Sequence, residues 1–332
     1  MPLPLDLSTR AWVLTDGKAG DEEPCRGIAE ALGLEPELRR VSPRALFAWA
    51  MPWSWPDPAE GPGRPQSPIR PPFPDLVIAS GRRSVPYLRA VARRSGGRVF
   101  TVFLKDPRTG PGLADLIWVP EHDSLRGPNV LATLTPPHRI SPERLRAAAV
   151  APDPRLAALP SPRVAVLVGG DSRHARFTEA DVARFAGQLR RLRDAGPSLM
   201  ITPSRRTPPA LRRALADLVD PRVFLWDGTD HNPYVPMLAL AEAIVATADS
   251  FNMIGEAAAT GVPILVFEPS GGHPKLRRFL HMLARHGAVH PFAGRLEGER
   301  YTPLDSTPVI AAAIAAAFAR GRHPGRPPGA PA

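Results

Sequence analysis

The sequence predicts an α/β fold with two Rossmann-like α/β/α domains that face each other across a cleft. Short apolar runs rich in β-branched residues alternate with helical segments over residues 10–155, and the alternation starts again over residues 160–310. Glycines or charged residues follow many of these runs, at the strand ends where α/β proteins bind ligands. The length of 332 residues suits two domains, each with its own core.

Composition narrows the classes of protein that fit. The single cysteine, Cys25, leaves neither a disulfide framework nor a multi-cysteine metal site. No apolar run approaches the roughly 18 residues that span a bilayer, and residues 1–10 lack the core of a secretory signal, so we expect a cytoplasmic protein. The net charge is +10, but the chain has no helix-turn-helix, finger or RNA-binding motif, so we expect no nucleic-acid partner.

An apolar strand at residues 11–15 opens the first domain and runs into a turn with two glycines. Glycines there let the backbone approach a ligand, Lys18 can contact an anion, and Asp16 or Asp21 can act as a general base. The spacing matches neither the dinucleotide nor the phosphate-loop fingerprint, and solvated turn residues are the alternative. The candidate residues of this turn are Asp16, Gly17, Lys18, Gly20 and Asp21.

Tryptophans gather in the next segment, where Trp49, Trp53 and Trp55 are three of the six in the chain. An aromatic patch beside arginines suits a membrane interface, and a hydrophobic flap packed on the first domain is the alternative. Residues 56–74 are rich in proline and glycine and predict an exposed loop.

Three further strands of the first domain deliver charged residues at their carboxyl ends. Because the pattern repeats, we predict that these residues line one cleft. His122 is a candidate acid or base, and a lone surface histidine is the alternative. Gly81 and Arg82 follow the strand 75–80, Lys105 follows the strand 99–104, and His122 follows the strand 116–119.

The second domain begins with a strand at residues 164–168, which leads into a glycine pair, Gly169 and Gly170. A later strand at residues 199–202 leads into Arg205 and Arg206. We place the linker between the domains in the later half of residues 133–162, a C-terminal helix at residues 311–320 and a disordered tail at residues 321–332.

Residues 249–269 form the best-defined unit of the second domain. A strand-like run at residues 243–247 leads to Ser250 and Asn252, which can cap a helix, and an apolar strand follows that helix. A helix that starts beyond the carboxyl end of a parallel strand points its N–H groups at an anion. We therefore predict a nucleotide site here, with Glu256 beside the ribose. An ordinary βαβ unit with a capped helix is the alternative.

The turns taken together resemble the mitochondrial-fission Elm-type family over about residues 10–310. The motifs that carry the resemblance are D-G-K-A-G-D, S-G-R-R-S, K-D-P-R, V-P-E-H-D, L-R-G-P-N-V, V-G-G-D-S-R-H, T-P-S-R-R-T and D-S-F-N-M-I-G-E-A-A-A-T-G-V-P. The resemblance implies a GT-B-like fold and, for bacterial members, glycosyltransferase-type activity. The plant member implies recruitment of a dynamin-related protein. We expect no dynamin-type partner here, because the chain is short and its bias towards arginine, proline and alanine looks like the GC-rich coding of a prokaryote.

The last motif is also similar to the nucleotide-binding helix of the N-acetylglucosaminyltransferase that makes the lipid-linked peptidoglycan precursor. That similarity implies that Glu256 holds the ribose hydroxyls and that Ser250 and Asn252 hold phosphate. It also implies that a glycine turn lies near the diphosphate, which matches Gly169 and Gly170. The first loop of that enzyme ends in a histidine, whereas the loop of this chain ends in Asp21, which leaves the catalytic base open.

The leading hypothesis is a metal-independent glycosyltransferase without a cofactor. A nucleotide-sugar is its substrate and binds the second domain, and the first domain holds an unidentified acceptor, lipid-linked or from the cell envelope. The expected donor-binding residues are Gly169, Gly170, Asp171, Ser172, Arg205, Arg206, Ser250, Asn252 and Glu256. The arginines would neutralise the leaving diphosphate. The candidate bases are Asp16, Asp21 and His122, in that order.

Two other functions fit the same sequence. One is a non-catalytic GT-B-like scaffold that recruits a protein partner at a membrane surface, and the other is a nucleotide-sugar epimerase. An anionic membrane surface is the second expected partner beside the nucleotide-sugar. It would place the protein on the inner face of the cytoplasmic membrane as a peripheral protein.

Overall fold

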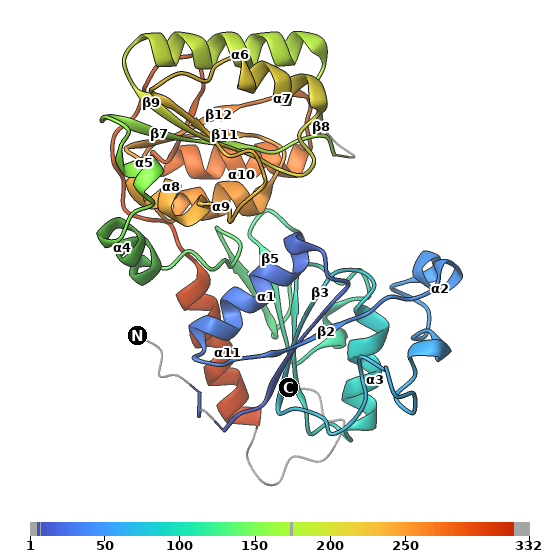
Figure 1. Ribbon diagram of the computed structural model, residues 1–332. Coiled ribbons are helices and arrows are strands. Elements are labelled where there is room, and N and C mark those ends of the chain that lie inside the picture. The colour runs from blue at the N-terminus through green and yellow to red at the C-terminus, as the bar shows by residue number, and fades with distance from the viewer. Residues whose placement is uncertain (1–4, 7, 173–174, 322–332) are drawn as a thin grey trace. The chain divides into compact units, whose positions relative to one another are not determined.

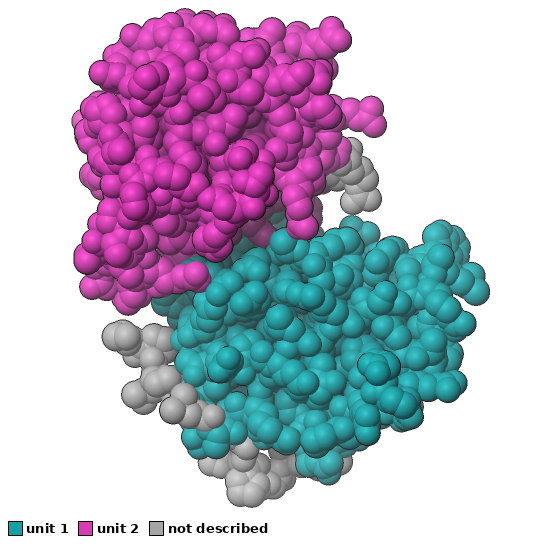
Figure 2. All heavy atoms as spheres, in the orientation of Figure 1, with its two compact units in different colours: residues 1–139, 306–332 teal, residues 140–305 magenta. Residues whose placement is uncertain are grey.

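The computed structural model describes residues 5, 6, 8–172 and 175–321. The chain divides into two compact units (Figures 1 and 2): unit 1 comprises residues 1–139 and 306–332, and unit 2 comprises residues 140–305. Each unit is built on a six-stranded sheet in which all neighbouring strands are parallel. The prediction of two Rossmann-like α/β domains is therefore confirmed.

Unit 1 has the strand order β2-β1-β3-β4-β5-β6. Neighbouring residues of β1 point to opposite faces of the sheet, and both faces are buried, as the apolar runs predict. Helices α1 and α11 cover one face, and α3 covers the other (Figure 1). The elements are β1 (Ala11–Thr15), α1 (Ala19–Ala31), β2 (Glu37–Arg40), α2 (Ala45–Ala50), η1 (Pro58–Glu60), β3 (Leu76–Ser80), α3 (Val85–Arg94), β4 (Phe100–Leu104), η2 (Pro111–Leu113), β5 (Leu116–Pro120), β6 (Val130–Thr133) and α11 (Thr307–Gly321).

Unit 2 has the strand order β10-β9-β7-β11-β12-β14, with α6 and α7 on one face and α8, α9 and α10 on the other (Figure 1). Helix α6 begins with a capping box, in which Thr178 and Asp181 exchange side-chain and backbone hydrogen bonds. The elements are α4 (Pro142–Val150), α5 (Pro154–Ala157), β7 (Arg163–Val168), β8 (Ala175–Arg176), α6 (Glu179–Asp194), β9 (Ser198–Pro203), α7 (Pro209–Ala216), β10 (Val223–Leu225), α8 (Tyr234–Leu240), β11 (Ala243–Thr247), α9 (Phe251–Ala258), β12 (Ile264–Phe267), β13 (Ser270–Gly271), α10 (Pro274–Arg285) and β14 (Val289–Pro291).

The boundary between the units differs from the expected one. Unit 1 ends at residue 139 rather than 155, because α4 packs against α8 and so belongs to unit 2. The C-terminal helix returns to unit 1, where Ile310, Ile314 and Phe318 are buried in the core. The expected disordered tail at 321–332 begins at the last residue of α11, and residues 322–332 lie outside the described residues.

Residues 56–74 are less exposed than their composition predicts. Asp57 and Ile69 are fully buried, and Ser67 donates a hydrogen bond to the carbonyl oxygen of Glu60 at 2.7 Å. The loop is therefore tied to unit 1 at several points. In the part of the chain that the structure describes, no helix is both long enough and apolar enough to cross a membrane.

The packing of helix α11 into the core of unit 1 can be tested by mutation. Ile314→Ala removes a fully buried side chain, so we expect the free energy of unfolding to fall by about 2–5 kcal/mol. Val309→Ala on the same helix changes a side chain that is 58% exposed, and its effect should stay within about 0.5 kcal/mol. Urea denaturation of both variants measures the difference, and equal effects would contradict the burial of α11.

Candidate functional site

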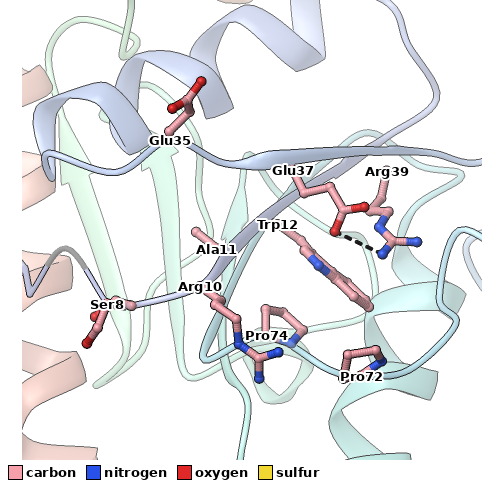
Figure 3. A pocket seen from close by; sticks show the side chains of 10 residues that line it. Ser8, Arg10, Ala11, Trp12, Glu35, Glu37, Arg39, Pro72 and Pro74 are labelled. Carbon is pink, nitrogen blue, oxygen red and sulfur yellow. Dashed lines mark hydrogen bonds and ion pairs between the residues drawn. The ribbon is translucent and has the colours of Figure 1, made fainter.

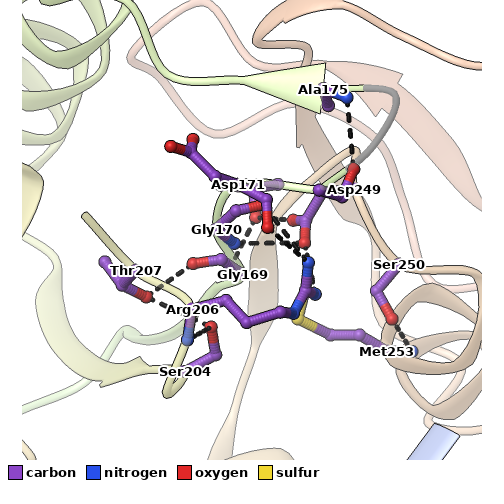
Figure 4. Close-up of polar contacts among 12 residues, drawn as sticks. Gly169, Gly170, Asp171, Ala175, Ser204, Arg206, Thr207, Asp249, Ser250 and Met253 are labelled. Carbon is purple, nitrogen blue, oxygen red and sulfur yellow. Dashed lines mark hydrogen bonds and ion pairs between the residues drawn. The ribbon is translucent and has the colours of Figure 1, made fainter. Parts of the chain in front are cut away.

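Three neighbouring strands of unit 2 bring the predicted donor-binding turns together. Strands β9, β7 and β11 are adjacent in the sheet and parallel, so their carboxyl ends lie side by side. Residues 204–207 follow β9, the glycine pair follows β7, and Asp249 and Ser250 follow β11 (Figure 4). The structure thus brings these three turns to one edge of the sheet.

The carboxylate of Asp249 joins the three turns, and its side chain has no exposed surface. Its Oδ2 accepts hydrogen bonds from the backbone N–H of Gly170 at 3.1 Å and from Nη2 of Arg206 at 2.7 Å (Figure 4). Its Oδ1 accepts from Oγ1 of Thr247 at 2.7 Å, and that hydroxyl accepts from the N–H of Gly169 at 2.8 Å. A buried carboxylate needs such donors to offset its desolvation.

The glycine pair is required by this close packing. A Cβ atom at Gly169 would lie 1.9 Å from Oδ1 of Asp249, and one at Gly170 would lie 2.0 Å from the carbonyl oxygen of Arg206. No larger residue fits at either position unless the turns move apart. The two glycines thus bring the backbone against neighbouring protein groups.

The N–H groups of residues 169–172, directly after β7, are used within the protein. Gly169 and Gly170 donate to Thr247 and Asp249, Asp171 donates to the carbonyl of Arg206 at 3.2 Å, and Ser172 donates to the carbonyl of Ala175 at 2.9 Å. The side chains of Asp171 and Ser172 also brace the loop, because they accept from the N–H groups of Phe177 and Ala175. These hydrogen bonds order the loop itself.

The two adjacent arginines have different surroundings. Arg206 pairs with Asp249, and its Nη1 donates to the carbonyl of Asp171 at 3.2 Å. Arg205 is exposed and makes no hydrogen bond or ion pair with the residues that the structure describes. Arg206 therefore holds the turns together, and Arg205 is the arginine that is open to an anion.

Helix α9 begins beside these turns and carries the predicted ribose residue. Ser250 caps the helix by accepting from the N–H of Met253 at 3.4 Å, and Asn252 lies in the first turn. Glu256 accepts a hydrogen bond from Oη of Tyr234, at the start of α8, at 2.6 Å. Burial raises the pKa of Tyr234 well above its usual value, and the nearby Glu256 carboxylate raises it further. The phenol therefore remains a donor.

The first candidate base in unit 1, Asp16, follows β1 and has a side chain that is only 3% exposed. It pairs with Lys18, and Nη1 of Arg83 lies 3.8 Å from its Oδ2. Gly17, between the two paired residues, has a φ of +76° that favours glycine. The predicted turn therefore holds its own lysine in an ion pair.

The second candidate base, Asp21, lies in the first turn of α1 with a side chain 16% exposed. Its Oδ1 accepts from Oγ of Ser80 at 3.1 Å and from Nζ of Lys105 at 2.7 Å, and Lys105 also donates to the carbonyl of Gly20 at 2.8 Å. A Cβ at Gly81 would lie 3.0 Å from Oδ2 of Asp21. The carboxyl ends of β1, β3 and β4 thus meet around Asp21.

Lys105, which the sequence places only among the charged residues expected to line the cleft, contacts Asp21. Its φ of +85° is uncommon for a residue with a side chain, and such backbone conformations cluster at functional sites. The sequence indicates this residue only by its position directly after the strand predicted at residues 99–104, which is β4.

Two predicted residues of unit 1 lie apart from the aspartates. Arg82 turns towards α2, where its guanidinium donates to the carbonyls of Ala48 at 3.0 Å and Met51 at 2.9 Å. These backbone contacts hold the guanidinium at the end of α2. His122 follows β5, which β3 and β4 separate from β1, so it lies about 14 Å along the sheet edge from the turn after β1.

A cavity of about 410 Å³ lies mostly at the opposite, amino-terminal end of the unit 1 sheet (Figure 3). Its wall includes Trp12, with the guanidinium carbon of Arg39 4.4 Å from the ring centroid, and Glu37, which pairs with Arg39 at 2.9 Å. None of the predicted site residues lines it. Within the described residues, no group of three histidine, cysteine, aspartate or glutamate side chains is placed to hold a metal ion.

Comparison with known sequences gives one matching family. The family model described as Mitochondrial fission ELM1 matches residues 19–318. "Mitochondrial fission protein ELM1" of Arabidopsis thaliana is 32% identical over an alignment of 270 positions, and the match covers 73% of this chain and 63% of that protein. An uncharacterized protein of Rickettsia prowazekii (strain Madrid E), RP120, is 30% identical over an alignment of 159 positions, and that match covers 45% of each chain. The chain spans less than two thirds of the length of both relatives.

Comparison with solved structures supports the fold. The UDP-GlcNAc 2-epimerase from Methanocaldococcus jannaschii superposes with a TM-score of 0.53 and 10% identity, covering 92% of this chain and 99% of that chain. At this identity the similarity is one of fold. It supports the fold of two Rossmann-like domains.

The glycine pair after β7 gives a test of the packing around Asp249. Gly169→Ala should lower the free energy of unfolding by about 2–4 kcal/mol, because its Cβ would displace the buried carboxylate. Gly187→Ala is the matched control, since the nearest atom to its Cβ is 4.0 Å away and alanine favours the α6 helix by about 0.5–1 kcal/mol. Thermal unfolding should therefore shift in opposite directions, and a neutral Gly169→Ala would contradict the described packing.

Proposed function

This chain belongs to the mitochondrial fission ELM1 family, and we propose that it is a glycosyltransferase that moves a sugar from a nucleotide-sugar to an acceptor. Unit 2 would bind the donor and unit 1 the acceptor. The observation that carries the proposal is the carboxyl edge of the unit 2 sheet, where Arg205, the start of α9 and Glu256 follow turns fixed by Asp249.

The diphosphate of the donor would bind at Arg205 and the start of α9. A helix N-terminus carries partial positive charge, and the hydroxyl of Ser250 and the amide of Asn252 lie in its first turn. Arg206 is already paired with Asp249, so the guanidinium of Arg205 supplies the additional positive charge. Together these groups would stabilise the diphosphate as it leaves without requiring a metal ion.

The ribose would bind at Glu256. In the structure a hydroxyl donor, Oη of Tyr234, already occupies one oxygen of that carboxylate at 2.6 Å. A ribose hydroxyl can replace it, because one hydroxyl–carboxylate hydrogen bond is exchanged for another, and the buried phenol of Tyr234 must then take another acceptor. Tyr234 would keep Glu256 oriented until the nucleotide arrives.

Asp21 is the carboxylate that we assign as the base. Its side chain is more exposed than that of Asp16, 16% against 3%, so an acceptor can reach it more easily. In the transfer step the acceptor hydroxyl loses its proton to Asp21 and its oxygen bonds to the anomeric carbon. The bond from that carbon to the diphosphate breaks, and the diphosphate leaves with the electron pair. Lys105 would position Asp21 through their 2.7 Å ion pair.

A nucleotide-sugar epimerase is the second candidate function. Two carboxylates, Asp16 and Asp21, lie at the same edge of unit 1, and an epimerase needs acidic or basic groups to remove and return a proton at the sugar. The two functions separate by product analysis, because epimerisation needs no acceptor. A third candidate, a non-catalytic scaffold that recruits a protein partner at the inner face of the cytoplasmic membrane, draws on the exposed tryptophans of unit 1.

Glu256→Ala tests the donor site. We expect its affinity for a nucleotide-sugar to fall about 10- to 100-fold, because a charged hydrogen bond to the ribose is lost. The measurement is the thermal shift of the protein with a panel of UDP-, GDP-, CMP- and ADP-linked sugars. Glu297→Ala is the control, since Glu297 pairs with Arg295 in an irregular segment near the end of unit 2. A Glu256→Ala variant that is stabilised as much as the wild type would remove Glu256 from the site.

Asp21→Asn tests the base. With the nucleotide-sugar and acceptor that support turnover, we expect kcat to fall about 10²- to 10⁴-fold while the affinity for the donor is unchanged. Asp106→Asn, an exposed residue beside Lys105, should leave kcat unchanged. If Asp21→Asn keeps wild-type turnover, the base is another group.

A further inference from the structure

The three adjacent tryptophans lie on the surface rather than in the core. Trp49, Trp53 and Trp55 are 80%, 67% and 70% exposed, and Leu46 is 75% exposed. We call residues 45–60 the tryptophan loop; it comprises α2, the following turns and η1 (Figure 1). Among the described residues, no other tryptophan is among the exposed large apolar side chains. The alternative of a flap packed on the first domain does not hold for these side chains.

Two buried residues of the tryptophan loop, which alternate along the chain with the exposed ones, anchor it to unit 1. Ala48 and Met51 are buried, and Met51 packs in the same core cluster as Val77 and Tyr87. Ala48 and Met51 therefore point inward from the same loop whose tryptophans point outward. The large rings remain exposed although the backbone that carries them is anchored.

An ion pair between an exposed arginine and a buried carboxylate ties the start of the tryptophan loop to its later part. Arg44, directly before α2, donates from its backbone N–H and its guanidinium to Asp57, with Nη2 of Arg44 2.7 Å from Oδ1. The side chain of Asp57 is 1% exposed, and its bonds with Arg44 hold the pKa of this carboxyl well below its usual range. The backbone N–H of Asp57 also donates to Oη of Tyr87, whose hydroxyl donates to Glu60.

Arg82 satisfies the carbonyls at the end of α2. Its guanidinium donates to the carbonyl oxygens of Ala48, Met51 and Trp49, at 3.0, 2.9 and 3.4 Å. These carbonyls receive no hydrogen bond within α2, because the helix ends at this point. Unsatisfied carbonyls are costly wherever water is scarce, so this contact makes the end of α2 compatible with an apolar environment.

Arginines outnumber carboxylates around the tryptophan loop, five to two between residues 39 and 70. Three of the five pair with carboxylates of unit 1, whereas Arg64 and Arg70 are exposed and make no ion pair with the residues that the structure describes. Both carboxylates, Asp57 and Glu60, accept hydrogen bonds from within unit 1. The guanidinium carbon of Arg93 lies 5.2 Å from the ring centroid of Trp55. The apolar surface thus carries arginines beside it and lacks exposed unpaired carboxylates of its own.

We propose that the tryptophan loop docks unit 1 onto an anionic lipid bilayer. Tryptophan rings favour the interface between water and acyl chains, and arginines beside them favour anionic headgroups. The exposed rings offer roughly 500 Å². A stable interface with a second protein buries about 800 Å² on each partner, which favours lipid as the occupant. This docking does not depend on sugar transfer.

Vesicle co-sedimentation of the full chain tests the proposal. We expect the protein to sediment with vesicles of equal parts phosphatidylcholine and phosphatidylglycerol, and less with phosphatidylcholine alone or at high salt. The triple variant Trp49→Ala, Trp53→Ala, Trp55→Ala should bind the anionic vesicles about 100-fold more weakly. Its thermal unfolding should match that of the wild type, because the three side chains are exposed.

Trp226→Ala is the matched control, since this tryptophan lies in unit 2 and donates to Asp230 at 2.9 Å. Its vesicle binding should equal that of the wild type. The proposal is overturned if the wild type stays in the supernatant with anionic vesicles, or if the triple variant binds as well as the wild type. It is also overturned if analytical ultracentrifugation shows a dimer that the triple variant loses, because a second copy would then cover the patch.

Discussion

The candidate donor site depends on one buried side chain, the carboxylate of Asp249. It accepts hydrogen bonds from the turns after β7 and β9 and from Thr247 at the end of its own strand β11. These bonds bring the backbone so close that only glycine fits at positions 169 and 170. The glycine pair, which resembles a phosphate-binding turn, therefore has a structural role first. The groups left for a ligand are the start of α9, Arg205 and Glu256.

Unit 1 uses the same kind of arrangement at the corresponding end of its sheet. Asp21 accepts hydrogen bonds from Ser80, the last residue of β3, and from Lys105, which directly follows β4. Strands β3 and β4 are neighbours in the sheet. In both units a carboxylate with little exposure collects donors from adjacent strand ends. Such networks set the shape of an edge before any substrate binds, which is what a site for phosphate or sugar groups requires.

Much of this architecture follows from sequence patterns, and the partners of individual side chains do not. Periodicity and glycine turns predicted both domains and most of the strands, and the strand expected at residues 243–247 is β11. The short strands β2, β6 and β14 were not predicted. The sequence of helix α11 is alanine-rich with a few larger apolar residues, and this pattern does not indicate which sheet the helix covers. Arg82 and Arg206 both follow strands as an anion-binding arginine would. Their partners, the end of α2 and Asp249, depend on folding contacts between distant segments.

A crystal structure of the protein with UDP tests the central claim most directly. The account predicts the diphosphate at the start of α9 beside Arg205, with the Asp249–Arg206 pair intact. It also predicts the ribose on Glu256, with the hydroxyl of Tyr234 displaced from its present 2.6 Å contact. A nucleotide bound away from the carboxyl edge of the unit 2 sheet, or bound there with the Tyr234–Glu256 contact unchanged, would contradict it.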